Sequence, residues 1–131
     1  MLHGNWLSKS RQAGELLSRG QYERSIEIYS EVAKAFPRLP EAHNNLGVAL
    51  RASGEINQAI KSYQRAVKLD PNYMIARNNL IRALWQIEKI EEALNNYIFV
   101  LKKSDLDSQV VSEAVYTVSY THLTLPTICS V

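Results

Sequence analysis

The feature that most constrains this chain is a sequence repeat in which similar residues recur 34 positions apart. Within residues 40–73, Ala59 aligns with Ala93 and Tyr63 aligns with Tyr97. Further pairs at the same offset are Leu46 and Leu80, Leu50 and Leu84, Leu16 and Leu50, Gly20 and Gly54, Tyr29 and Tyr63, and Pro37 and Pro71. A period near 34 with helical patterning inside each unit is typical of a helix–turn–helix solenoid, whose units complete their cores only by stacking.

The first unit predicts two helices separated by a glycine turn. We expect its first helix over Trp6–Ser18, with Asn5 as the N-cap that accepts a free backbone N–H. Gly20 should end that helix, because glycine readily takes the positive φ of a helix end. The second helix is expected over about Tyr22–Ala35, where apolar residues recur at helical spacing.

The middle unit shows the pattern most clearly. Pro40 suits the start of its first helix, since proline lacks the N–H that would be unpaired there. Gly54 closes that helix, and a second helix is expected over about Ile56–Leu69. Gly47 should lie where the two helices of the unit come closest, because a side chain there would wedge them apart.

The third unit departs from the pattern at three positions. Ile81 replaces the small residue of the earlier units, Glu88 replaces the turn glycine and Asp105 replaces the proline. Uncompensated overpacking of the kind that Ile81 would cause typically costs ~1–3 kcal/mol. We therefore expect local repacking of this helix pair.

A column is a set of positions that correspond at the offset of 34 residues. In these columns the chain resembles the tetratricopeptide repeat (TPR) family over about residues 6–117. The resemblance implies an all-α fold: a helix–turn–helix solenoid of three repeats plus the start of a fourth, forming a short right-handed superhelix. The implied divisions are an N-terminal lead at 1–5, repeats at 6–39, 40–73 and 74–107, the first helix of a truncated fourth repeat at 108–117, and a tail at 118–131. In that pattern Tyr63 and Ala66 face the next unit.

The tail at 118–131 changes character. It has no Asp, Glu, Lys or Arg, shows no helical period and holds the only cysteine, Cys129. A DNA sequence that could encode it matches the transposase mosaic end and adapter used to prepare sequencing libraries. The tail therefore resembles a translated sequencing adapter. We expect this tail to be non-native and the natural chain to be cut at about Thr117; a genuine threonine-rich tail is the alternative.

The sequence predicts neither catalysis nor a cofactor. The formal net charge is only +2 and no run of Lys or Arg occurs, which argues against a nucleic-acid partner. No segment predicts a signal peptide or a membrane span, so we expect a cytoplasmic location. His3, His43 and His122 lack the spacing of metal ligands, and no nucleophile or phosphate-binding motif occurs. We expect His43 to have a packing role or to lie at the rim of the groove.

The resemblance implies that the first helix of each unit lines a concave groove. The candidate peptide-binding residues in those columns are Asn44, Asn45, Val48, Arg51, Asn78, Asn79, Arg82 and Trp85. An amide offers both a donor and an acceptor, which suits the backbone of an extended peptide. Asn45 and Asn79 fall where O-linked N-acetylglucosamine transferases carry a ladder of asparagines. The asparagines could instead only solvate the helix face, the arginines could be ordinary surface charges, and Trp85 could cover the next helix.

The resemblance also allows a test for chaperone-tail binding. TPR domains of that kind hold a C-terminal carboxylate with Lys and Asn in the first repeat, Asn in the second, and Lys and Arg in the third. The corresponding residues are Ser10, Gly14, Asn45, Ile75 and Asn79. Because Asn45 alone agrees, we expect no binding of an acidic chaperone tail.

Three functions follow as hypotheses. The first is a protein–protein interaction scaffold that binds an extended peptide or a partner helix in its concave groove. The second is the N-terminal TPR region of a larger enzyme, of the glycosyltransferase or sulfotransferase type, whose catalytic domain is missing. The third is a structural repeat that self-associates through its exposed stacking face.

Overall fold

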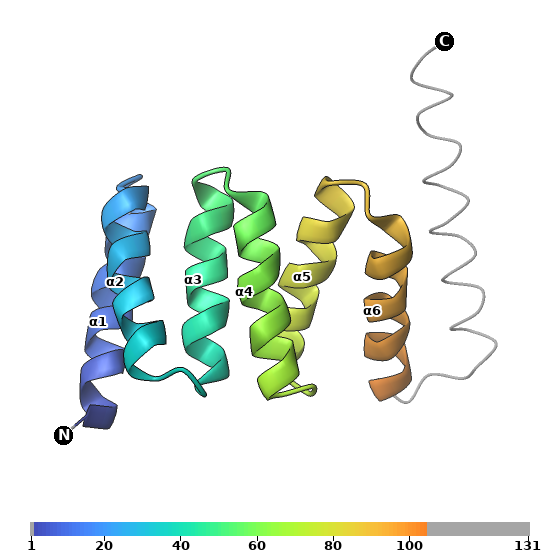
Figure 1. Cartoon of the computed structure of the whole chain (residues 1–131), viewed down its shortest axis with the longest axis horizontal. Helices are drawn as coiled ribbons and strands as arrows, with labels where there is room; N and C mark the ends of the chain where they lie inside the picture. The colour runs from blue at the N-terminus through green and yellow to red at the C-terminus, as the bar shows by residue number, and fades with distance from the viewer. Residues whose placement is uncertain (1, 105–131) are drawn as a thin grey trace, which may run out of the picture.

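The computed structural model describes the backbone of residues 2–104 and the side chains of residues 6–104. This part of the chain is all-α and forms a row of antiparallel helices, each beside the next (Figure 1). The helices are α1 (Leu2–Ser18), α2 (Tyr22–Ala35), α3 (Pro40–Ala52), α4 (Ile56–Leu69), α5 (Met74–Gln86) and α6 (Ile90–Lys103). The expected helical solenoid is confirmed.

The helix bounds agree with the sequence-based prediction for α2, α3 and α4 but not for α1. Helix α1 begins at Leu2, so Asn5 lies inside the helix and the prediction that it is the N-cap is wrong. No proline interrupts residues 2–5, and a capping residue does not by itself stop a helix that continues on its N-terminal side.

The turn inside each helix pair uses a left-handed backbone conformation. Gly20 has φ of 78° and Gly54 has φ of 91°, as expected for glycine after a helix. Glu88 keeps the same conformation, with φ of 64°, although it carries a side chain. The turn geometry has therefore been retained in the third pair without its glycine.

The middle pair is closely packed at Gly47. A Cβ atom added to this glycine would lie 2.5 Å from Cε1 and 2.7 Å from Cδ1 of Tyr63 on α4. Tyr63 is only 1% exposed. The absence of a side chain at Gly47 is thus what allows the tyrosine ring to lie against α3, as the sequence predicted.

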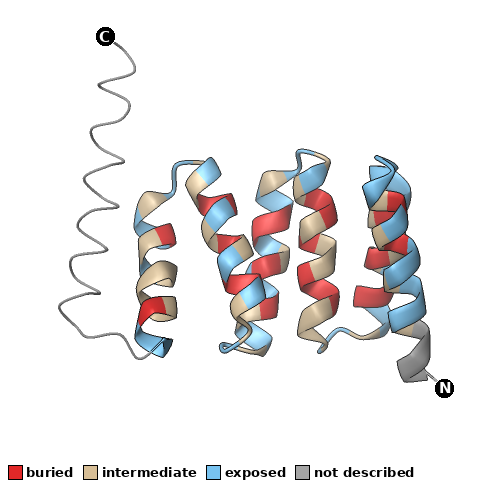
Figure 2. Ribbon diagram, turned by 180° about the vertical axis from the view of Figure 1, so that it is seen from behind, coloured by how far each residue is buried: buried red, intermediate tan, exposed pale blue. Residues whose placement is uncertain are grey.

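The main hydrophobic cluster is continuous from α3 to α6, and Figure 2 shows its buried positions on the facing sides of the helices. Its buried members are Leu50, Ala59, Ile60, Tyr63, Leu80, Ala83, Leu84 and Ala93. Tyr63 of the second pair shares this cluster with Leu80 and Ala83 of α5. The second pair therefore completes its core with residues of the third.

The third pair is packed differently. Ile81 occupies the column of Gly47, and Tyr97, which corresponds to Tyr63, is half-buried where Tyr63 is buried. This difference agrees with the repacking expected from the larger side chain. The truncated fourth repeat at 108–117 and the tail at 118–131 lie outside the described residues, and the repeat boundaries remain a division proposed from the sequence.

Candidate functional site

A polar hollow lies between α3 and α5, with Tyr63 of α4 among its lining residues. Its volume is about 460 Å³, and it is lined by Val48, Arg51, Ala52, Tyr63, Asn79, Arg82 and Gln86. Residues three apart on a helix share a face, which places Val48 beside Arg51 and Asn79 beside Arg82. The hollow thus brings together Val48, Arg51, Asn79 and Arg82 from the predicted groove.

The polar groups of the hollow are mostly hydrogen-bond donors. Arg51 donates from Nε to Oε1 of Gln86 across the two helices, at 3.3 Å. Burial raises the pKa of Tyr63 to about 12, although the nearby positive charge of Arg51 acts in the opposite direction. Tyr63 therefore keeps its hydroxyl proton at neutral pH, so it adds no negative charge to the hollow.

Asn44 differs from its predicted role. Its side chain is buried, at 4% exposure, and its Oδ1 accepts a hydrogen bond from Nδ2 of Asn79 at 2.9 Å. Burial raises the pKa of the nearby Tyr73, and the Asn44 side chain acts in the opposite direction. Asn44 joins α3 to α5 and has almost no surface to offer a ligand, so the expectation that it binds peptide is not supported by its surroundings.

The other three asparagines of the predicted groove, Asn45, Asn78 and Asn79, remain accessible at the surface. Asn79 still has a second amide N–H and its Oδ1 beyond the bond to Asn44. Asn45 is half-buried and Asn78 is exposed, and neither lines the hollow. At the offset of 34 residues, Asn45 and Ser10 correspond to Asn79 and Asn44, but the buried Oγ of Ser10 has no hydrogen-bond partner. The amide pair is therefore not repeated there.

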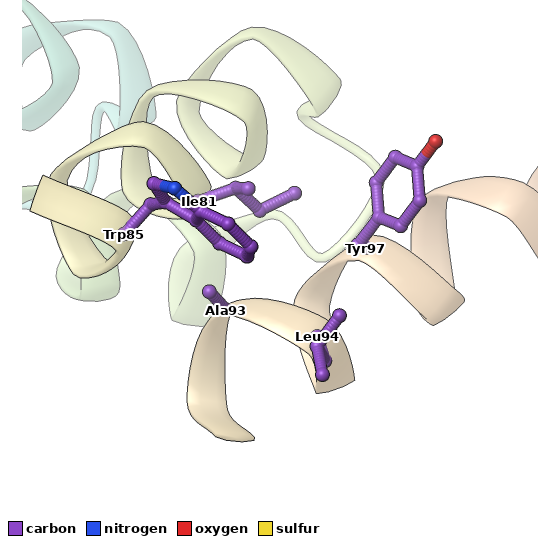
Figure 3. Close-up of a pocket in the computed structure, with 5 residues that line it drawn as sticks. All are labelled: Ile81, Trp85, Ala93, Leu94 and Tyr97. Atoms are coloured by element: carbon purple, nitrogen blue, oxygen red, sulfur yellow. The ribbon is translucent and has the colours of Figure 1, made fainter. Parts of the chain in front are cut away.

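Trp85 lies elsewhere, in an apolar pocket between α5 and α6. This pocket has a volume of about 270 Å³ and is lined by Ile81, Trp85, Ala93, Leu94 and Tyr97 (Figure 3). Trp85 also packs against the main hydrophobic cluster. Trp85 does not line the polar hollow, and its role in peptide binding stays a prediction.

Three lining residues, Ala52, Tyr63 and Gln86, were not singled out as site residues from the sequence. Tyr63 was assigned to the core alone, because its column is apolar in all three units. Gln86 follows Arg82 by four residues, so helical spacing could have placed it on the same face. Its partner Arg51 lies on another helix, and no sequence spacing reports that contact.

Other features of the described chain have structural roles. His43 is buried and donates from Nε2 to the carbonyl of Pro37 at 2.8 Å, in agreement with the predicted packing role.

Within residues 6–104 no group of three His, Cys, Asp or Glu side chains could hold a metal ion. No helix of that region combines the length and apolarity needed to cross a membrane.

Comparison with known proteins supports the repeat assignment. The family model described as Tetratricopeptide repeat matches residues 40–73. No curated protein sequence matches this chain.

Solved structures similar to this fold are TPR domains. The second TPR of Spaghetti (RPAP3) bound to the HSP90 peptide SRMEEVD is 25% identical to this chain. The match covers 73% of this chain and 89% of that structure, with a TM-score of 0.68. The second TPR domain of human RPAP3 in complex with the HSP70 peptide SGPTIEEVD is also 25% identical. That match covers 85% of this chain and 92% of the RPAP3 domain, with a TM-score of 0.72. The Sgt2 TPR domain from Aspergillus fumigatus is 19% identical. Its match covers 89% of this chain and 78% of the Sgt2 domain, with a TM-score of 0.75. Residues 40–73 thus match the tetratricopeptide repeat model, and the described part of the chain shares its helical solenoid with solved TPR domains.

Proposed function

We propose that this protein is an interaction scaffold that binds an extended peptide across the hollow between α3 and α5. The observation that carries the proposal is the convergence of Arg51, Asn79 and Arg82 on one open hollow over the ring of Tyr63. Guanidinium and amide groups can donate several hydrogen bonds to the carbonyls of an extended chain. The peptide complexes of the similar RPAP3 domains support this use of the fold.

An extended peptide suits the dimensions of the site better than a small ligand. The hollow is open, and its lining residues come mainly from two neighbouring helices, α3 and α5. Few polar groups placed on such a surface fix the orientation of the ligand, while the apolar floor contributes buried area. We expect micromolar affinity, because an open surface of this size buries little area.

The protein should not act as a receptor for an acidic chaperone tail. The columns that hold a terminal carboxylate in such domains contain Ser10, Gly14 and Ile75, which carry no positive charge. The arginines of the hollow lie at other columns. The chaperone peptides bound by RPAP3 therefore indicate how the fold binds peptide, and the specificity proposed for this chain is different.

The test is a peptide selection followed by titration. Immobilised protein is incubated with a random peptide library displayed at the N-terminus of a phage coat protein, and enriched peptides are synthesised with a fluorescent label. We expect Arg82→Ala to weaken their binding measured by fluorescence anisotropy. Arg82 is chosen over Asn79 because Asn79 also bonds the buried Asn44, so its loss would mix folding with binding.

The matched control is Arg65→Ala, since Arg65 is an exposed arginine on α4 that does not line the hollow. This variant should bind like the wild type, and circular dichroism should show that both variants remain folded. Equal loss in the two variants, or no enriched peptide at all, would contradict the proposal.

The alternative of a larger enzyme with a lost catalytic domain gains no support from the similar structures named above. It remains a hypothesis from the sequence, as does self-association through the stacking face.

A further inference from the structure

The hollow carries a positive charge that its own surroundings do not neutralise. Arg51 and Arg82 are both among the lining residues, and none of the lining residues is acidic. The ion pairs within residues 6–104 are Lys9 with Glu31 and Lys89 with Glu92, so neither arginine has a carboxylate partner there. Two cations facing one concave space create a local positive potential, although the net charge of the whole chain is only +2.

An exposed apolar side chain continues the same face of α5. Ile75 is 62% exposed, the highest value among the large hydrophobic residues that are exposed in the described chain. Ile75, Asn79, Arg82 and Gln86 follow one another at steps of four, three and four residues, which places them on one stripe of the helix. The stripe therefore begins at an apolar side chain, Ile75, and runs to the guanidinium group of Arg82, which shares the hollow with Arg51 of α3.

On this basis we propose that the ligand is an extended peptide with an acidic side chain that pairs with Arg51 and Arg82, and an apolar side chain that packs on Ile75. This inference rests on the proposed function and assigns the chemistry of the peptide that the hollow selects. The acidic group is the side chain of an internal Asp or Glu.

The spacing of the two contacts sets the spacing in the peptide. Ile75 and Arg82 are seven residues apart, which corresponds to about 10.5 Å along a helix at 1.5 Å per residue. An extended chain advances about 3.3 Å per residue. The apolar residue and the acidic residue should therefore lie about three positions apart in the peptide.

The polar lining also explains why a carboxylate is favoured over a neutral group. A carboxylate accepts from two donors at once, and charge-assisted hydrogen bonds are stronger than neutral ones. Arg51 already donates from Nε to Gln86, which holds the guanidinium in place and leaves its terminal nitrogens for a ligand. The amide of Asn79 can add a contact to the peptide backbone beside the acidic residue.

The peptide selection described above tests the inference, because displayed peptides have no free C-terminal carboxylate. We expect the wild type to enrich peptides with Asp or Glu about three positions from an apolar residue. The variant with both Arg51→Gln and Arg82→Gln should lose the acidic preference, whereas Arg65→Gln should keep it. Thermal melts confirm that each variant is folded before the selection.

A double-mutant cycle then locates the charge pair. Replacing the acidic residue of a selected peptide by its amide should weaken binding to the wild type roughly three- to tenfold, and Arg82→Gln should have an effect of the same size. The two changes together should cost little more than either alone, since both remove the same interaction. Affinity should also fall as the salt concentration rises.

The outcomes separate this inference from the proposed function. Enriched peptides without acidic residues, or an acidic preference that survives in the double variant, would overturn the charge assignment while leaving peptide binding in place. Acidic peptides that bind equally well to Ile75→Ser would overturn the apolar contact. Failure to enrich any peptide would overturn both proposals.

Discussion

At the scale of single residues, one glycine determines how the middle helix pair packs. Gly47 faces the ring of Tyr63 so closely that no Cβ atom fits without movement of the ring. Tyr63 in turn lies in the main cluster with residues of α5 and contributes to the floor of the hollow. A change at Gly47 therefore affects the core and the candidate site together.

We predict that Gly47→Ala lowers the free energy of unfolding by about 1–2 kcal/mol. Overpacking against a buried ring typically costs ~1–3 kcal/mol, and the better helix propensity of alanine offsets up to ~1 kcal/mol of it. Gly14→Ala on α1 is the matched control, because its Cβ would meet only the Tyr29 hydroxyl, at 3.4 Å. Urea unfolding should show the control to be as stable as the wild type or more so. Equal stability of the two variants would refute the packing account.

A second residue-scale prediction concerns the turn between α5 and α6. Glu88 adopts a positive φ that costs a residue with a Cβ atom about 1 kcal/mol. Glu88→Gly should raise the free energy of unfolding by roughly 0.5–1 kcal/mol through relief of this strain. The conformational entropy that glycine adds to the unfolded chain reduces this gain. Glu55→Gly, which follows Gly54 and does not have a positive φ, should instead destabilise the protein. A destabilised Glu88→Gly variant would show that the side chain compensates for the strain.

At the scale of the elements, a basic side chain fixes the first turn of two helices to the preceding loop. His43 on α3 bonds the carbonyl of Pro37, and Arg77, which is 34 residues later on α5, donates from Nη2 to the carbonyl of Pro71 at 3.1 Å. Arg77 also donates from Nη1 to Oδ1 of Asn96 at 2.8 Å. The side chain thus ties α5 both to its own loop and to α6.

We predict that Arg77→Ala destabilises the fold by about 2–3 kcal/mol. The variant loses two charge-assisted hydrogen bonds, and it uncovers the ring of Phe99, whose centroid lies 3.8 Å from Cζ of Arg77. Arg65→Ala, at an exposed position on α4, should change the stability by less than about 0.5 kcal/mol. A shift of similar size in both variants, measured by chemical denaturation, would mean that the contacts of Arg77 contribute little.

The elements also show what the sequence could predict. The period of 34 residues and the position of Pro40 were enough to place α3 and α4, because each helix start and end has a local chemical signal. The same period could not show that Asn79 bonds Asn44, since the two side chains sit in different columns of neighbouring units. The separation of Trp85 from the polar hollow depends on packing between α5 and α6, which helical spacing does not report.

At the scale of the whole molecule, stacking creates both the core and the site. The main cluster runs through four helices, and the hollow is lined by residues of α3, α4 and α5 that no single repeat contains. Columns of the repeat could nominate Arg51 and Arg82 separately. Their convergence on one hollow requires the second and third helix pairs to be stacked.

Peptide binding at the hollow is tested most directly by mapping where a selected peptide binds, using backbone amide chemical shifts of the isotope-labelled protein. We predict that the largest shifts on titration fall in residues 48–52 of α3 and 75–86 of α5, which include the residues of these helices that line the hollow. Amides of α2 and of the exposed face of α4 around Arg65 should shift little. Shifts concentrated in α6 around Leu94 and Tyr97, with none at residues 48–52, would contradict this prediction and assign binding to the apolar pocket between α5 and α6.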